Sequence, residues 1–148
     1  MKIKQELLQA CLDYANKRII NYKNELQTIK ESIEDSDKGG GDDEDSGNSK
    51  LLSDLEKNSQ HLSEANKMLN GLKDISSKTV SEKVILGSVV RTSNNNFFLS
   101  VSAGKIDITD GSYFAISQHS PIGMLLMGKT KGATIEFNGN KFTITEVI

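Results

Sequence analysis

Two series of apolar residues, each with alternating spacings of four and three, constrain the first half of this chain of 148 residues. Such spacing is typical of the apolar seam of a coiled-coil helix. The first series consists of Leu8, Leu12, Ala15, Ile19, Tyr22, Leu26, Ile29 and Ile33. The second series consists of Leu51, Leu55, Asn58, Leu62, Ala65, Leu69 and Leu72. The pattern predicts two long helices, with the polar Asn58 interrupting the second seam.

The two seams match each other when the chain folds back on itself near residue 42. Ile33 then lies opposite Leu51 and Ala15 opposite Leu69, and the residue numbers in each pair add to 84. Glycines cluster at the bend, whereas the seam positions contain neither Gly nor Pro. A homodimeric coiled coil, in which each helix meets its copy, is the alternative. The matching seams favour an intramolecular antiparallel hairpin, and we expect a monomer.

The acidic segment 34–50 carries most of the charge asymmetry of the chain. It holds seven Asp and Glu residues against two lysines, which gives the segment a net charge of -5, while the whole chain carries -2. A small net charge indicates no general attraction to nucleic acid or to an anionic membrane. The predicted bend is therefore an acidic tip. The acids are Glu34, Asp35, Asp37, Asp42, Asp43, Glu44 and Asp45.

Beyond residue 79 the apolar pattern changes to period two, with many β-formers. Segments 84–92, 97–103, 113–117, 134–137 and 141–148 are predicted as strands. Asn138-Gly139 predicts a tight hairpin turn between the last two. Ser120 as N-cap and Pro121 at the first helical position predict a short helix that ends at Gly128. Its candidate core residues are Leu125, Leu126 and Met127.

These patterns predict an α+β protein with two parts, a coiled-coil hairpin over 1–79 and a small sheet domain over 80–148. Only 36% of the residues are hydrophobic and Trp is absent, which suits an elongated helical part joined to a small globular one. The single cysteine, Cys11, lies in the helical apolar pattern and is expected to be a buried, reduced thiol. The N-terminal charges are too closely spaced for a signal peptide, and we expect a cytoplasmic protein.

The segment ISQHSPIGMLLMGKTKGATIEF, residues 116–137, resembles the "IS..SPIG.AL.GK..GD.V" signature of the Gre transcript-cleavage factors. A helical hairpin ahead of this segment is also the arrangement of that family, so the resemblance extends over nearly the whole chain. With its short length, the chain looks most like the compact GreA/GreB-like proteins of Bacteroidetes. The shared positions are Ile116, Ser117, Ser120, Pro121, Ile122, Gly123, Leu126, Gly128, Lys129 and Gly132.

The resemblance implies an FKBP-like C-terminal domain and a transcription elongation factor that binds bacterial RNA polymerase. Such a hairpin enters the secondary channel, and its tip stimulates cleavage of backtracked RNA. The protein would not be an enzyme itself, because the polymerase supplies the nuclease activity. In the family's tip motif, "GD..EN", Asp42 matches the first carboxylate and Asp45 stands where Glu is usual. These two would share a Mg²⁺ ion with polymerase carboxylates, since no tightly bound cofactor is expected.

Other functions remain open at the level of the sequence. The aspartate-rich tip also resembles the non-cleaving inhibitors of the Gre family. A prolyl isomerase would need an aromatic-walled pocket, and the core needs most of Phe97, Phe98, Tyr113, Phe114, Phe137 and Phe142. A coiled-coil adaptor is a further alternative. An EF-hand beginning at Asp42 is a poor fit, because its twelfth position is Ser53 instead of a bidentate Glu.

The remaining candidate residues have ordinary structural explanations. His61 is expected to be a solvated residue of the helical arm, and Ser120 beside His119 is better explained as a cap than as a nucleophile. The two methionines of the short helix are expected to fill the core. Two lysines, which could touch polymerase, follow that helix. These residues are Met124 and Met127, and Lys129 and Lys131.

Overall fold

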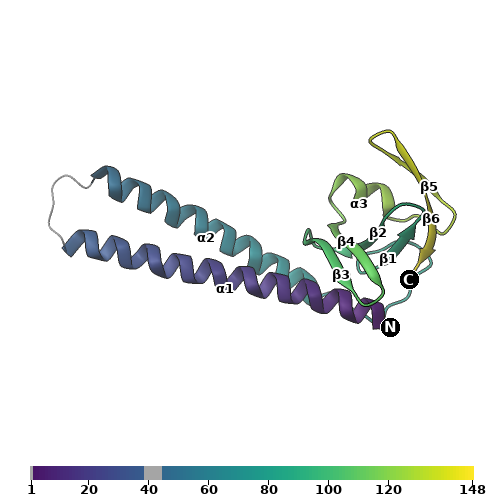
Figure 1. The fold of residues 1–148 in the computed structure, drawn as a ribbon, viewed down its shortest axis with the longest axis horizontal. Coiled ribbons are helices and arrows are strands. Elements are labelled where there is room, and N and C mark those ends of the chain that lie inside the picture. The colour runs from purple at the N-terminus through teal and green to yellow at the C-terminus, as the bar shows by residue number, and fades with distance from the viewer. Residues whose placement is uncertain (1, 39–44) are drawn as a thin grey trace. The chain divides into compact units, whose positions relative to one another are not determined.

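The computed structural model of the chain describes residues 2–38 and 45–148, with the backbone alone for 36–38 and 45–48. Two long helices come first, α1 (Lys2–Lys38) and α2 (Asp45–Lys73). Six strands and one short helix follow (Figure 1). They are β1 (Val89–Thr92), β2 (Asn96–Ser100), β3 (Gly104–Ile108), β4 (Gly111–Ser117), α3 (Pro121–Leu126), β5 (Thr134–Phe137) and β6 (Asn140–Val147). The predicted α+β class, with a helical hairpin ahead of a sheet, is confirmed.

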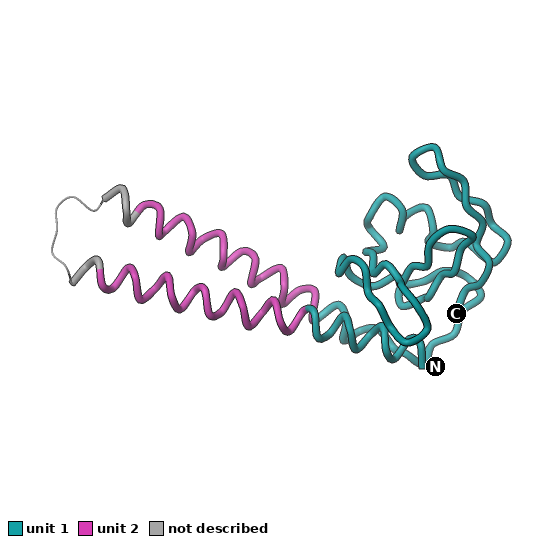
Figure 2. The backbone as a smooth tube through the Cα atoms, viewed as in Figure 1, with its two compact units in different colours: residues 1–14, 70–148 teal, residues 15–69 magenta. Residues whose placement is uncertain are grey.

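The chain packs into two compact units (Figure 2). One unit consists of residues 15–69 and contains the antiparallel parts of α1 and α2. The other consists of residues 1–14 together with 70–148 and contains the sheet. Helix α1 therefore contributes residues to both units.

The helical unit follows the predicted seam. Ile19 and Leu26 of α1 and Ala65 of α2 are buried, whereas most residues between the seam positions are exposed. Burying one apolar face in this way stabilises helices that would be marginal by propensity alone. The intramolecular hairpin is therefore confirmed.

The sheet has the strand order β3-β4-β2-β1-β6-β5. All neighbouring strands are antiparallel except β2 and β4, which pair in parallel from Phe97 with Phe114 to Ser100 with Ser117. The connection between β2 and β4 includes β3, which forms the sheet edge. At the opposite edge, Asn138 and Gly139 both have positive φ, at 51° and 80°, as a tight β5–β6 turn requires.

The core of the sheet unit lies between the sheet and α3. Its buried members come from five of the strands and helices and from the segment before β1. Ile116, Ile122 and Met127 pack against it while partly exposed. The buried members are Val84, Val90, Phe97, Leu99, Leu126, Ile135, Phe142 and Ile144.

The first turns of α1 belong to the sheet unit. Leu7 and Cys11 are fully buried there, although the heptad pattern selects their neighbours Leu8 and Leu12, which are half-buried. The Cys11 thiol lies 3.8 Å from the hydroxyl of Ser100 on β2. Burial raises the pKa of Cys11 to about 11, and the contact with Ser100 opposes this rise only in part. The seam shifts because this part of α1 packs against β2 as well as against α2.

Several local predictions need correction. Residues 84–88 precede β1 and are not part of it, since Ser88 and Ile85 form a turn. The strand predicted over 97–103 ends at Ser100, and β3 was not predicted. On α3, Leu126 is buried as expected, but Leu125 is 39% exposed. Met124 is 63% exposed and does not fill the core, because it lies on the face of α3 opposite to the core-facing Ile122 and Leu126.

Candidate functional site

The acidic segment provides the first candidate site, and its two key carboxylates lie outside what the structure describes. Asp42 falls among residues 39–44, and the side chain of Asp45, the first residue of α2, is not described. Glu34 and Asp35 are exposed near the end of α1. Within residues 2–38 and 45–148, no group of three or more His, Cys, Asp or Glu side chains could hold a metal ion.

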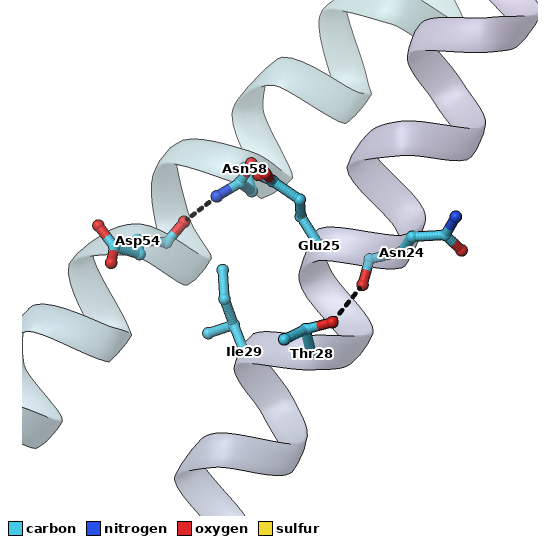
Figure 3. A pocket seen from close by; sticks show the side chains of 6 residues that line it. All are labelled: Asn24, Glu25, Thr28, Ile29, Asp54 and Asn58. Atoms are coloured by element: carbon cyan, nitrogen blue, oxygen red, sulfur yellow. Dashed lines mark hydrogen bonds between the residues drawn. The ribbon is translucent and has the colours of Figure 1, made fainter.

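An opening of about 610 Å³ lies between the helices where Asn58 interrupts the seam. Figure 3 shows Ile29 of α1 pointing into this opening, with Glu25 reaching toward Asn58. The amide of Asn58 donates to the backbone oxygen of Asp54 in its own helix, at 2.9 Å. A polar residue in a coiled-coil seam either fixes the register of the two helices or weakens their packing. Because the Asn58 amide bonds within its own helix, the geometry favours the second role. The opening is lined by Asn24, Glu25, Thr28, Ile29, Asp54 and Asn58.

The signature Ser-Pro-Ile-Gly forms the start of α3, and each residue type has a local physical reason. The Ser120 hydroxyl accepts a hydrogen bond from the Gly123 N–H at 3.1 Å and donates to the Ser117 oxygen at 2.6 Å. Pro121 occupies the first helical position, where no N–H is needed. A Cβ at Gly123 would lie 2.0 Å from the Ser117 oxygen, so only glycine fits. The predicted cap is confirmed.

The exposed side of α3 provides the second candidate site, here called the α3 surface. It consists of the exposed Met124 and Leu125, followed by the exposed Lys129 and Lys131 after the helix. Met side chains adapt to irregular partners, and exposed apolar residues beside cations are typical of protein-binding surfaces. The sequence pattern missed this surface because apolar residues on a short helix were assigned to the core.

A charged cluster around Arg91 connects β1 with β6 and with the turn between β3 and β4. Arg91 forms salt bridges of 2.9 Å with both Asp110 and Glu146. It also donates to the hydroxyl of Tyr113, which in turn donates to Asp110. Burial raises the pKa of Tyr113, and the hydrogen bond to Asp110 is the second cause of this rise. The contact with Arg91 lowers the pKa of Tyr113. Every charge in the cluster has a partner, and the cluster has a structural explanation.

In the part of the chain that the structure describes, no helix is long and apolar enough to cross a membrane.

Comparison with known proteins gives only distant similarities. No model of a protein family matches the sequence, and no curated protein matches it significantly. The structure is similar to that of GreA factor homolog 1 (Gfh1) of Thermus thermophilus, with 20% identity and a TM-score of 0.36, covering 97% of this chain and 93% of that one. It is also similar to Thermus aquaticus Gfh1, with 20% identity and a TM-score of 0.34, covering 94% of each chain.

Another structure, described as the transcription factor Gfh1, has 19% identity and a TM-score of 0.36, with 92% of each chain covered.

Proposed function

We propose that this chain is a Gre-type transcription elongation factor that binds bacterial RNA polymerase in the cytoplasm and stimulates cleavage of backtracked RNA. The observation that carries the proposal is the order of parts along the chain. An intramolecular helical hairpin has the acidic segment 34–50 at its bend, and a sheet domain follows with the Ser120–Gly123 cap. The signature resemblance and the hairpin are independent features, and both belong to the Gre arrangement.

In this proposal the chemistry belongs to the partner. Asp42 and Asp45 supply oxygen ligands to a Mg²⁺ ion that polymerase carboxylates also hold. Such an ion activates water and stabilises in-line displacement at phosphorus. The chain contributes the length of its helical hairpin and the negative charge at its bend. Helix α1 has 37 residues, which corresponds to about 55 Å at about 1.5 Å per residue.

The α3 surface supplies most of the affinity for polymerase in this proposal. Met124 and Leu125 give an apolar contact that a -5 segment cannot provide. Replacing both with Ser should weaken binding to polymerase at least about tenfold, since burial of each contributes about 1 kcal/mol or more. Ile20→Ser is the control, because Ile20 is 58% exposed and belongs to the helical unit instead of the sheet unit. Equal binding by the double variant and the control would contradict this role.

The decisive experiment measures RNA cleavage by a stalled, backtracked RNA polymerase from the organism that encodes the chain. Full-length protein should increase the cleavage rate in the presence of Mg²⁺. Polymerase binding without faster cleavage would replace the proposal with its alternative, a Gre-like inhibitor. Four successive acids, Asp42 to Asp45, favour that alternative because they place diffuse negative charge at the tip. Absence of polymerase binding would contradict both.

A further inference from the structure

Strand β3 forms one edge of the sheet and leaves part of its backbone unpaired. A turn of two residues joins Ile108 to Gly111, so these two residues exchange both of their backbone hydrogen bonds. Hydrogen-bonded and non-hydrogen-bonded pairs alternate along an antiparallel ladder, which puts Lys105 and Asp107 in non-hydrogen-bonded pairs with β4. Their N–H and C=O groups therefore point away from β4, and no other segment within residues 2–38 and 45–148 pairs with them.

The side chains of β3 agree with this assignment. Asp107 lies opposite Ser112 on β4, and the Ser112 hydroxyl donates to its carboxylate at 2.5 Å. Side chains approach each other most closely in non-hydrogen-bonded pairs. Lys105 and Asp107 are both exposed, so a partner can reach this edge of the sheet.

A groove of about 420 Å³ separates the end of β3 from α1. Asp107 and Ile108 line one wall, and one face of α1 lines the other. Both walls belong to the sheet unit (Figure 2). Because a helix closes the far side, the groove admits a single extended segment and not the edge of a second sheet. The α1 residues, three or four positions apart on one side of the helix, are Glu6, Gln9, Ala10 and Asp13.

The groove combines negative charge with an apolar floor. Ala10 and Ile108 are half-buried and form the apolar part. Glu6 and Asp13 each accept a hydrogen bond from a neutral side chain, at 3.2 and 2.9 Å. In the part of the chain that the structure describes, no salt bridge neutralises Glu6, Asp13 or Asp107. The groove therefore presents carboxylates without a cation beside a strand with free backbone groups.

These two features together select an extended segment that contains arginine. An added strand pairs its backbone with the free groups of β3, which is how several peptide-binding domains extend a sheet. Its side chains alternate between two sides, so residues at alternate positions face α1. Arginine has several donors and no acceptor, which suits the carboxylates, and its aliphatic stem suits the apolar floor.

We propose that β3 binds an extended segment of a partner protein as an additional strand, whose arginine side chains contact Glu6 and Asp13 of α1. The proposal concerns the sheet unit alone and does not rest on the proposed function.

The test is an NMR titration of the full chain with the capped peptide Thr-Arg-Val-Arg-Thr, in which threonine and valine favour a strand. The backbone N–H signals of Lys105 and Asp107 should shift in a saturable way, and their exchange with solvent should slow. N-methylation of the three central residues removes their backbone donors and should weaken binding at least about tenfold. Replacing both arginines with citrulline keeps their shape, removes their charge and should weaken binding at least about fivefold.

The two control peptides separate the parts of the proposal. Equal binding of the N-methylated peptide would mean an adventitious attraction of charges and would overturn the added strand. Equal binding of the citrulline peptide would overturn the role of the carboxylates. The absence of saturable shifts, or shifts confined to other parts of the chain, would overturn the proposal as a whole.

A pair of variants at one position tests the free backbone of β3. Lys105→Pro removes the outward N–H, and an edge strand tolerates proline where its N–H does not join the ladder. Lys105→Ala keeps this N–H and is the matched control. Only the proline variant should weaken binding of the arginine peptide, by about fivefold or more.

A second pair of variants tests the charge of α1. Glu6→Gln with Asp13→Asn removes two charges from the groove. Asp74→Asn with Glu136→Gln removes two charges from exposed positions of the sheet unit that do not line the groove. Only the first double variant should weaken binding, by about fivefold or more. Should Lys105→Pro fail to fold, this comparison and the N-methylated peptide decide the proposal, and unchanged affinity in either folded test variant would contradict it.

Discussion

The phenol ring of Tyr22 on α1 stacks on the imidazole of His61 on α2, with ring centroids 5.3 Å apart and 20° between the ring planes. The seam alignment pairs Tyr22 with Leu62, the next residue after His61. His61 precedes the predicted partner Leu62 by one residue, so this stacking agrees with a helical pairing close to the predicted register. His61 is exposed, as expected for a residue of the arm, but it covers a tyrosine instead of standing free in solvent.

This register predicts a specific crosslink. Cysteines at Leu26 and Asn58, in a Cys11→Ala background, should be joined within one chain by a short bifunctional maleimide. Mass spectrometry of the monomer band checks the product. Leu26→Cys with Leu52→Cys is the control, because Leu52 is exposed and lies about two turns from the paired position. Crosslinks formed only between chains would contradict the intramolecular hairpin.

Asn58 is expected to weaken the hairpin. Its amide bonds only within α2, beside an opening between the helices, so Asn58→Leu should add apolar contact with α1. We expect the free energy of unfolding to rise by about 1 kcal/mol. Asn21→Leu is the same substitution at an exposed position of α1 and should change stability by less than about 0.5 kcal/mol. Chemical denaturation followed by circular dichroism measures both. A loss of stability in Asn58→Leu would show that the polar residue holds the register.

Two glycines should respond to alanine in opposite ways. Gly123→Ala forces a methyl group against the Ser117 oxygen and should lower the free energy of unfolding by about 2–3 kcal/mol. Gly71→Ala, in the last turns of α2, meets no atom within 4 Å and should raise stability by up to about 1 kcal/mol, because alanine favours the helix. Thermal unfolding of the two variants checks the difference. Equal effects would mean that the cap at Ser120 is not close-packed.

Much of the fold could be predicted because the local patterns agree with the packing. The heptad seams fix two helices and their pairing, and Ser120, Pro121, Asn138 and Gly139 specify their own caps and turns. The prediction fails where packing overrides pattern. Leu7 and Cys11 are buried because α1 meets β2, which no helical period reveals.

The functional features differ in how far the sequence reveals them. A single acidic segment is visible in the composition of residues 34–50. The α3 surface is not visible in the sequence, because Met124 and Leu125 look like core residues until the buried face of α3 is known. The pocket lined by Phe97, Phe114, Ile122, Phe137 and Phe142 is assembled from four separate segments of the chain, so periodicity could not reveal it. The roles of Asp42 and Asp45 stay predictions.

The buried thiol predicts a pH dependence of stability. The pKa of Cys11 is about 11 in the folded chain, against 9.0 for an ordinary thiol, because burial disfavours the thiolate. The stabilisation from keeping the thiol neutral is complete below pH 9 and is lost as the pH rises toward 11. The loss should reach on the order of 2 kcal/mol.

Cys11→Ala should remove the contribution of thiol titration to stability. The difference in the free energy of unfolding between wild type and variant should therefore shrink as the pH rises from 9 to 11. Denaturation curves at pH 8 to 11 provide the comparison, which also cancels the titration of Tyr113. A constant difference between the two proteins would contradict the burial of Cys11 in solution.

The tip acids separate activation from inhibition. If Asp42 and Asp45 help to hold the metal, Asp42→Asn or Asp45→Asn should slow RNA cleavage about a hundredfold, which corresponds to about 3 kcal/mol, with little change in polymerase binding. Glu44→Gln should be nearly neutral. If the protein is instead an inhibitor with diffuse tip charge, neutralising any one of the four acids should have a small and similar effect on inhibition. These acids are Asp42, Asp43, Glu44 and Asp45. The cleavage rate of a backtracked complex is the measurement.

The placement of β6 has a consequence for synthesis on the ribosome. Its residues Phe142 and Ile144 complete the core, and Ile148 exchanges two backbone hydrogen bonds with Val89. The sheet unit also takes in residues 2–14, which leave the ribosome before any strand does. The helical unit, residues 15–69, is one continuous stretch of chain, so both of its helices have been synthesised before the sheet strands. We therefore expect the hairpin to form during translation. The sheet unit must wait for its last strand, and until then Leu7 and Cys11 stay exposed to chaperones and to oxidants.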